Sequence, residues 1–277
     1  MPILDSHRHF WHYNDTEFGW IADECLRKDF LPGGALGDRA LPQCIAVEAR
    51  QSIEETDWLL SMAADPANNI AGVVGWLPIA ADNFPEILAQ YGRAGSPLPA
   101  APRLVGLRHV VQDEPDDDFI LRPNFVRGVK HLLAQGYTYD ILVFERHLKN
   151  VIKFVDELPP DARLVLDHMG KPHNFSTWAP LISELAQRQN VYCKLSGLVT
   201  ELQGKDQGRG HSCPREQDIR PYLDLVLSAF GPERCMFGSD YPVVSATTTY
   251  DWWLNQILPL GPAVLHDTAA RFYQLFT

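Results

Sequence analysis

The chain alternates short apolar runs with stretches of helical periodicity from one end to the other. Short runs rich in β-branched residues predict strands, and apolar stripes at helical spacing predict helices. Strands are expected near Ile3–Asp5, Cys44–Glu48, Ala71–Leu77, Leu104–His109, Tyr139–Val143, Leu164–Asp167, Val191–Leu195 and Cys235–Gly238. Eight strand–helix units in 277 residues favour a closed (β/α)8 (TIM) barrel, an α/β fold. A single domain over residues 1–277 is therefore expected.

The predicted helices have recognisable starts and stops. Ser52 and Glu55 form a capping-box pair, with Ser52 as N-cap and Glu55 at the third helical position. An apolar stripe from Leu148 to Leu158 ends at two prolines, and further helices are expected after Trp178 and over Pro221–Phe230. No G-x-G-x-x-G follows the first strand, which argues against the usual dinucleotide-binding fold.

Composition excludes some partners. The chain carries 24 Lys and Arg against 35 Asp and Glu, a net charge of −11, which argues against nucleic acid or an anionic membrane. Its longest uncharged apolar stretch, Ile70–Ala81, is too short to span a bilayer. Five scattered cysteines without a C-x-x-C pair indicate buried free thiols. With no secretory signal pattern at the N-terminus, a cytoplasmic protein is expected.

Polar residues gather at the predicted strand ends, where barrels of this kind carry their active sites. His7 and His9 are two apart, so on a strand both rings face the same side. The strand-end residues are Asp5, His7, His9, Glu48, Arg50, Trp76, Arg108, His109, Tyr139, Asp167, His168, Lys194, Ser196, Ser239, Asp240 and Tyr241.

Several of these residues have a structural reading beside the functional one. Glu48 and Arg50 form either an ion pair or part of a site. Arg108 and Lys194 either pair with a carboxylate (Glu48 or Asp167) or hold a substrate oxygen, because buried cations need a partner.

Two loops follow predicted strands. The acidic run 113–118 is expected to be a solvated loop or a helix start. The irregular, Gly-rich segment 203–216 follows the seventh strand, where loops lie over the active site.

These residues resemble a known family. The segments Asp5-Ser-His7-x-His9-Phe, Asp167-His168, Lys194-x-Ser196-Gly and Gly238-Ser-Asp240-Tyr-Pro are similar to the amidohydrolase superfamily. Residues 47–56, 75–76, 106–118 and 195–201 resemble its sugar-lactonase branch, close to L-fuconolactone hydrolases.

The resemblance implies a (β/α)8 barrel that hydrolyses the cyclic ester of an aldonic acid. It assigns Asp240 as the general base for water, with His7, His9 and His168 in the same site. Binuclear members also use a Lys on strand four and a His on strand five, which this chain lacks there. The expectation is that no cofactor is required, although His7, His9, His168 and Asp240 are a possible ligand set for one Zn²⁺.

The remaining roles follow from the reaction. A tetrahedral oxyanion needs positive or donor groups, for which Arg108, Lys194 and the three imidazoles are the candidates. The candidates for binding sugar hydroxyls are Glu48, Arg50, His109, Gln112 and Tyr139, with Trp11 and Trp76 stacking on the ring. The expected partner is a small-molecule sugar lactone. Which sugar, which ring size and which oligomeric state are left open.

Three other functions remain as alternatives. A metal-dependent decarboxylase of the same superfamily would use the same four ligands. A lactonase for an aromatic-derived dicarboxylate lactone needs several arginines, and Lys194 stands where one would be expected. A non-catalytic barrel that binds a sugar acid is disfavoured because Asp240 and the histidines are all present.

Overall fold

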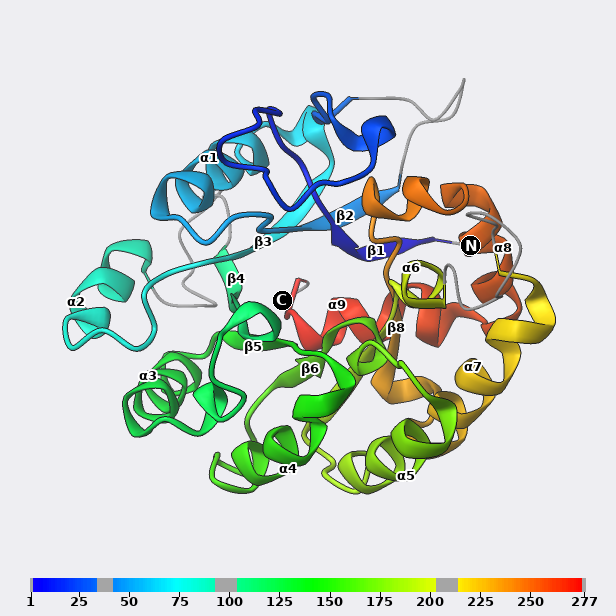
Figure 1. The fold of residues 1–277 in the computed structure, drawn as a ribbon. Coiled ribbons are helices and arrows are strands. Elements are labelled where there is room, and N and C mark those ends of the chain that lie inside the picture. The colour runs from blue at the N-terminus through cyan, green and yellow to red at the C-terminus, as the bar shows by residue number, and fades with distance from the viewer. Residues whose placement is uncertain (1, 34–41, 93–103, 203–213, 276–277) are drawn as a thin grey trace.

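The computed structural model describes residues 2–33, 42–92, 104–202 and 214–275, and it is a nearly closed parallel barrel (Figure 1). Each strand pairs in parallel with the next one along the chain, in the order β1 to β8. The strands are β1 Leu4–Arg8, β2 Gln43–Val47, β3 Ile70–Gly75, β4 Leu104–Val110, β5 Thr138–Leu142, β6 Leu164–Leu166, β7 Val191–Leu195 and β8 Cys235–Phe237. All eight predicted strands are confirmed, with Val191–Leu195 matching at both ends and the other seven shifted at one or both ends. The largest shift is at β1, which continues to Arg8.

The first and last strands meet at their carboxyl ends. Arg8 forms a parallel bridge with Tyr241, just beyond β8. The His9 amide donates to the Tyr241 carbonyl at 2.8 Å, and the Asp240 amide donates to the His7 carbonyl at 2.9 Å. This pairing explains why β1 runs past Asp5, and it places the segment after β8 beside the end of β1.

The helices are α1 Ile53–Ala63, α2 Phe84–Leu88, α3 Pro123–Ala134, α4 Leu148–Asp156, α5 Phe175–Leu185, α6 Leu198–Leu202, α7 Glu216–Phe230, α8 Tyr250–Ile257 and α9 Thr268–Phe272. Most of them form a ring outside the strands, whereas α9 lies near the centre of the barrel (Figure 1). Two predicted starts were wrong because α5 begins before Trp178 and α7 begins before Pro221. In both helices a proline is tolerated six residues in, and the caps lie upstream at Asn174 and Arg215.

The start of α1 follows half of the predicted capping box. Ser52 Oγ accepts from the Glu55 amide at 3.1 Å, as expected. Glu55 does not reach back to Ser52. Its carboxylate instead accepts from the Ala49 and Arg50 amides at 3.1 and 2.6 Å. The helix start is thereby joined to the end of β2, next to the site.

Two apolar layers hold the barrel. One lies between the strands and the outer helices. The other fills the barrel interior at the amino ends of the strands and includes Leu4, Ile45, Val165, Met236 and residues of α9. The site is therefore confined to the opposite, carboxyl end.

Three further expectations concern the cysteines, the segment 203–216 and membrane spans. Cys44, Cys193 and Cys235 are buried free thiols as expected, but Cys25 is exposed on the short 3-10 helix Glu24–Leu26. Cys213 lies outside the described residues. Most of the segment 203–216 lies outside the described residues. Within the described ranges, no helix is both long and apolar enough to cross a membrane.

Candidate active site

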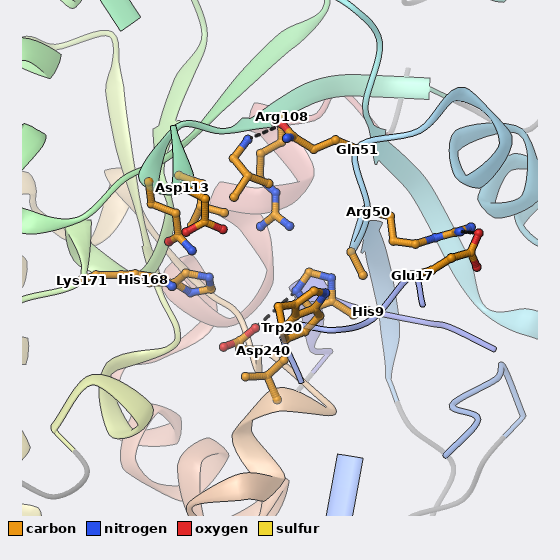
Figure 2. Close-up of a pocket in the computed structure, with 15 residues that line it drawn as sticks. His9, Glu17, Trp20, Arg50, Gln51, Arg108, Asp113, His168, Lys171 and Asp240 are labelled. Atoms are coloured by element: carbon orange, nitrogen blue, oxygen red, sulfur yellow. Dashed lines mark hydrogen bonds and ion pairs between the residues drawn. The ribbon is translucent and has the colours of Figure 1, made fainter. Parts of the chain in front are cut away.

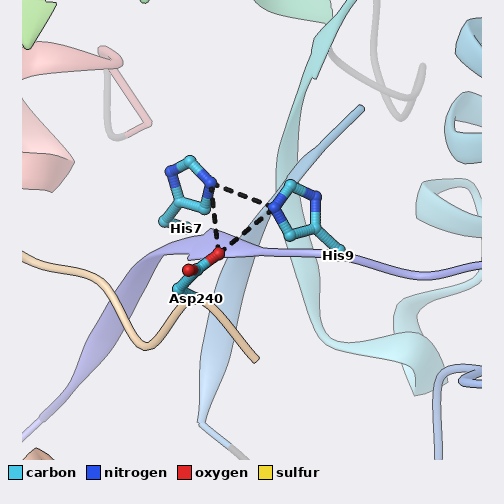
Figure 3. A group of neighbouring side chains, drawn as sticks. All are labelled: His7, His9 and Asp240. Atoms are coloured by element: carbon cyan, nitrogen blue, oxygen red, sulfur yellow. Dashed lines mark hydrogen bonds and ion pairs between the residues drawn. The ribbon is translucent and has the colours of Figure 1, made fainter. Parts of the chain in front are cut away.

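Two histidines of β1 and an aspartate after β8 form the centre of the site (Figure 3). The two Nε2 atoms of His7 and His9 are 3.1 Å apart. Asp240 Oδ1 lies 3.4 Å from His9 Nε2 and 3.8 Å from His7 Nε2. The predicted same-face placement of the two histidines is confirmed, and three ligand-type atoms converge on one point.

Local backbone geometry brings Asp240 to these histidines. Gly238 lies so close to β1 that a Cβ there would be 2.8 Å from the Cβ of His7, so only glycine fits. Asp5 Oδ1 accepts from the Ser239 amide at 2.8 Å. Asp240 itself has a φ of 58°, in the left-handed region. The Gly-Ser-Asp segment therefore turns sharply and points the carboxylate at His7 and His9.

His168 approaches the same space from the end of β6. Its φ is 53°, and its Nδ1 lies 2.8 Å from Ser196 Oγ. Gly197 leaves room for the ring, because a Cβ at that position would be 2.5 Å from His168 Nδ1. Burial lowers the pKa of His168 to about 4. The ring is therefore neutral near pH 7, and when Ser196 donates to Nδ1 the ring proton sits on Nε2.

Arg108 on β4 is held by two carboxylates. Its Nε donates to Glu48 Oε1 at 2.8 Å, and its Nη1 donates to Asp167 Oδ2 at 3.1 Å. Nη2 donates to the Glu48 carbonyl, and Nη1 lies 3.2 Å from His7 Nε2. These contacts leave one Nη2 hydrogen without a partner among the described residues. Arg50 pairs instead with Glu17 and Glu55, so the Glu48–Arg50 ion pair suggested by the sequence is not formed.

Lys194 on β7 is fully buried beneath His7. Its Nζ contacts Asp140 Oδ2 at 2.5 Å, Asp167 Oδ1 at 3.0 Å and His7 Nδ1 at 3.1 Å. Tyr273, just after α9, donates to the same Asp140 oxygen at 2.9 Å. We use the name charged floor for the buried charged and imidazole groups of the site, which are His7, His9, Glu48, Arg108, Asp140, Asp167, His168, Lys194 and Asp240.

The floor shifts the protonation of its acids in opposite directions. Burial raises the pKa of Asp140 to about 6, against the lowering effect of Lys194. Burial would also raise the pKa of Asp167, but Lys194 and His7 lower it well below its usual value. For Asp240 the effect of burial is outweighed by His168, His9 and His7, which lower its pKa. Asp240 is therefore ionised and able to accept a proton.

A cavity of about 520 Å³ opens above the floor (Figure 2). Arg108, His168, His9 and Asp240 point into it from different strand ends. The full lining is His9, Glu17, Trp20, Ala49, Arg50, Gln51, Arg108, Val110, Gln112, Asp113, Leu142, His168, Lys171, Asp240 and Val243. Of the predicted site residues, these six border it: His9, Arg50, Arg108, Gln112, His168 and Asp240.

Two predicted aromatic contacts lie away from the cavity. Trp11 is completely buried, and its indole donates to the Lys28 carbonyl at 2.9 Å. The Trp76 indole donates to His109 Nδ1 at 3.2 Å, while His109 Nε2 lies 2.7 Å from Glu114. Neither tryptophan nor His109 is among the lining residues.

The other predicted site residues outside the lining lie deeper. Tyr139 is fully buried inside β5, and its hydroxyl has no hydrogen-bond partner among the described residues. His7, Glu48 and Lys194 belong to the charged floor and reach the cavity only through His9, Arg108 and Asp240.

Sequence reasoning missed several polar or aromatic lining residues, namely Glu17, Trp20, Gln51, Asp113 and Lys171. Gln51 and Lys171 lie just beyond predicted strand ends, so extending the strand-end rule by a few residues would have found them. Asp113 opens the acidic run, which was assigned to a solvated loop. Glu17 and Trp20 sit on the long β1–β2 connection, which carries no pattern that indicates a site.

The His7, His9 and Asp240 cluster has the geometry of a metal site. Ligand atoms of a tetrahedral Zn²⁺ with bonds of about 2.0–2.1 Å lie about 3.3–3.4 Å apart, close to the distances in this cluster. His9 Nδ1 lies 2.9 Å from the Val47 carbonyl oxygen, an acceptor that fixes the ring proton on Nδ1. The lone pair of His9 Nε2 therefore faces the cluster. The donors fit a single zinc ion, although the Arg108 guanidinium beside His7 Nε2 opposes a second positive charge.

Comparison with known proteins identifies the family. The amidohydrolase family model matches residues 4–275. The chain belongs to the amidohydrolase family. It is 40% identical to an L-fucono-1,5-lactonase of Burkholderia multivorans, covering 98% of this chain and 96% of the relative. A second L-fucono-1,5-lactonase, from Burkholderia ambifaria, is 31% identical over 98% of this chain and 95% of its own length.

A solved amidohydrolase structure shows a metal in a relative. This crystal structure of an amidohydrolase from Burkholderia multivorans, with bound Zn, has a TM-score of 0.86 and 38% identity over 99% of each chain. Amidohydrolases often bind a metal, and the described residues of this one include a possible His and Asp site.

Proposed function

We propose that this amidohydrolase opens the ester ring of a sugar lactone, such as an L-fucono- or L-rhamnonolactone, by attack of a base-activated water. The observation that supports this proposal most strongly is the ionised Asp240 carboxylate, which lies with His9, His168 and Arg108 at the bottom of the cavity. The names of the two curated relatives support the substrate class and favour ring opening over the decarboxylase alternative.

Asp240 acts as the general base. Its carboxylate takes a proton from water as the oxygen attacks the lactone carbonyl. The ring oxygen then leaves as an alkoxide and receives that proton back from Asp240. A carboxylate with a lowered pKa is a weak base, so this assignment requires strong stabilisation of the oxyanion.

Arg108 and His168 supply that stabilisation. The Nη2 hydrogen of Arg108 that has no partner among the described residues can reach the cavity, and Glu48 and Asp167 hold the guanidinium in place. His168, neutral and bonded to Ser196, presents Nε2–H to the same space. Donors fixed before the reaction stabilise the developing charge without reorganising.

Lys194 acts indirectly, through His7. Because its ammonium is buried against Asp140, Asp167 and His7, we assign it to holding His7 rather than to touching the oxyanion. This assignment replaces the direct role suggested by the sequence.

Turnover is proposed not to require a metal. Zn²⁺, when bound, would be held by His7, His9 and Asp240 and would polarise the carbonyl as a Lewis acid. Calorimetric titration should detect one Zn²⁺ per chain, with binding lost in His9→Gln. Enzyme dialysed against a strong chelator should retain turnover. Complete loss of activity, restored by Zn²⁺ alone, would contradict the metal-independent assignment.

A pH-indicator assay tests the proposed function. Purified protein should acidify solutions of stereoisomeric aldonolactones, with a rate preference for one of them. The Asp240→Asn variant, carried through the same purification, is the control for contaminating esterase. No acid release from any aldonolactone would reject the proposal, and release of CO₂ from a carboxylated aromatic substrate would favour the decarboxylase.

A further inference from the structure

Trp20 is an unusually exposed aromatic side chain at the edge of the cavity. Half of its surface is open, and it lies on the connection that follows β1. Four large apolar side chains in the described residues have comparable exposure: Trp20, Leu31, Phe175 and Leu258. Of these four, Trp20 is the one that lines the cavity (Figure 2).

The indole of Trp20 is supported from behind. Its ring meets the Trp11 ring edge-on, with centroids 5.8 Å apart and an interplanar angle of 84°. Trp11 is buried among Phe18 and Phe30, with ring centroids at 5.8 and 5.4 Å. The buried partner, Trp11, anchors the segment to the barrel. Trp20 adds little to that anchoring because half of it faces solvent.

Trp20 shares the cavity lining with two small apolar residues that follow other strands. Ala49 and Val243 also line the cavity, and both pack against the cluster of Trp11 and Phe18. We call Trp20, Ala49 and Val243 the apolar wall. The rest of the lining includes the donors Arg108, His168 and Lys171. A ligand in this cavity therefore meets an aromatic face at Trp20 and charged or hydrogen-bonding groups elsewhere, together with the two apolar side chains Val110 and Leu142.

This division suits the two kinds of surface on a sugar lactone, whose C–H groups form apolar patches and whose oxygens need donors. We propose that Trp20 is the stacking platform for the apolar face of the lactone ring, and thus a substrate-binding residue that sets affinity. The proposal rests on the proposed function and adds a substrate contact to it. Burying the open face of a tryptophan against a ring stabilises binding through apolar area and dispersion.

Two substitutions separate stacking from a structural role. Trp20→Ala should raise KM for the preferred aldonolactone, and weaken affinity for its aldonate product, by about 10-fold or more, with kcat within about 3-fold. Trp20→Phe keeps an aromatic face, so its KM and its affinity for the aldonate should stay within about 3-fold of those of the parent protein. Phe175→Ala is the matched control, because it removes an exposed aromatic of α5 that is not among the lining residues.

Steady-state kinetics and calorimetric titration with the aldonate give the readouts, and thermal unfolding checks the fold. If Trp20→Ala hydrolyses the lactone normally with unchanged KM and unchanged product affinity, the stacking proposal is overturned and the proposed function is not affected. If Trp20→Ala and Trp20→Phe weaken substrate and product binding equally and both lower the Tm, the role of Trp20 is structural and the stacking proposal is overturned. If the parent protein hydrolyses no aldonolactone, both proposals fail.

Discussion

The charged floor and the apolar wall bound the same cavity, but their side chains are held differently. On the floor, His7, Asp167 and Lys194 are completely buried, and each contacts at least two charged or ring groups. On the wall, Trp20 is half exposed and is held by ring contacts with the β1–β2 connection. Groups on the floor thus have fixed positions, and the carboxyl groups of Asp140, Asp167 and Asp240 have shifted pKa values, whereas the wall offers area for binding. We infer that the floor sets the rate and the wall sets the affinity.

The largest expected effect concerns the stability contributed by the floor. Lys194→Met leaves Asp140 and Asp167 buried without their shared cation, so the free energy of unfolding should fall by about 3–5 kcal/mol. Lys171→Met is the matched control. That lysine is partly exposed and its Glu201 partner is 3.5 Å away, so a change of at most about 1 kcal/mol is expected.

Chemical denaturation followed by circular dichroism measures both variants. If Lys194→Met and Lys171→Met lower the free energy of unfolding by equally small amounts, the buried ion pairs of the floor do not contribute the stability assigned to them.

A second expected effect is a pH dependence located on the floor. Burial lowers the folded pKa of His168 to about 4, below its ordinary value of 6.5, so the unfolded chain takes up the proton first. Stability is therefore lost as pH falls from about 6.5 towards 4. Between pH 7 and pH 5 the contribution of His168 to this loss is about 2 kcal/mol.

Denaturation curves at the two pH values measure this dependence. Between pH 7 and pH 5, the free energy of unfolding of His168→Gln should fall by about 2 kcal/mol less than that of the parent protein. His12→Gln, which changes an exposed histidine of the β1–β2 connection, is the control and should behave like the parent protein. The same pH dependence in His168→Gln and the parent protein would remove His168 from this account.

The smallest expected effect concerns Tyr139, which belongs neither to the charged floor nor to the cavity lining. Its buried hydroxyl has no hydrogen-bond partner among the described residues. Tyr139→Phe should therefore leave kcat/KM unchanged and alter stability by no more than about 1 kcal/mol in the stabilising direction. A clear rise in KM would instead restore the hydroxyl-binding role that its sequence position suggests.

The sequence predicted the floor far better than the wall. A strand end places its side chains by a two-residue period, and barrel closure brings all eight ends together. His7, His9 and Asp240 could therefore be assigned to one site although they lie at opposite ends of the chain. Asp140 was missed because an acidic residue inside an apolar strand carries no sign of its partner, Lys194.

The wall could not be predicted in this way. Trp11, Trp20 and Trp76 look alike in the sequence, and only packing decides which indole is buried and which lines the cavity. Trp11 follows the first strand directly and was the natural choice, yet it became the anchor for the connection that carries Trp20.

Parallel kinetics of Asp240→Asn and Trp20→Ala on one aldonolactone test the division between floor and wall most directly. Asp240→Asn should lower kcat by at least about 100-fold with KM near that of the parent protein, because it removes only the proton acceptor. Trp20→Ala should raise KM and leave kcat nearly unchanged. Turnover of Asp240→Asn close to that of the parent protein would contradict the assignment of Asp240 as the base, and with it the central claim.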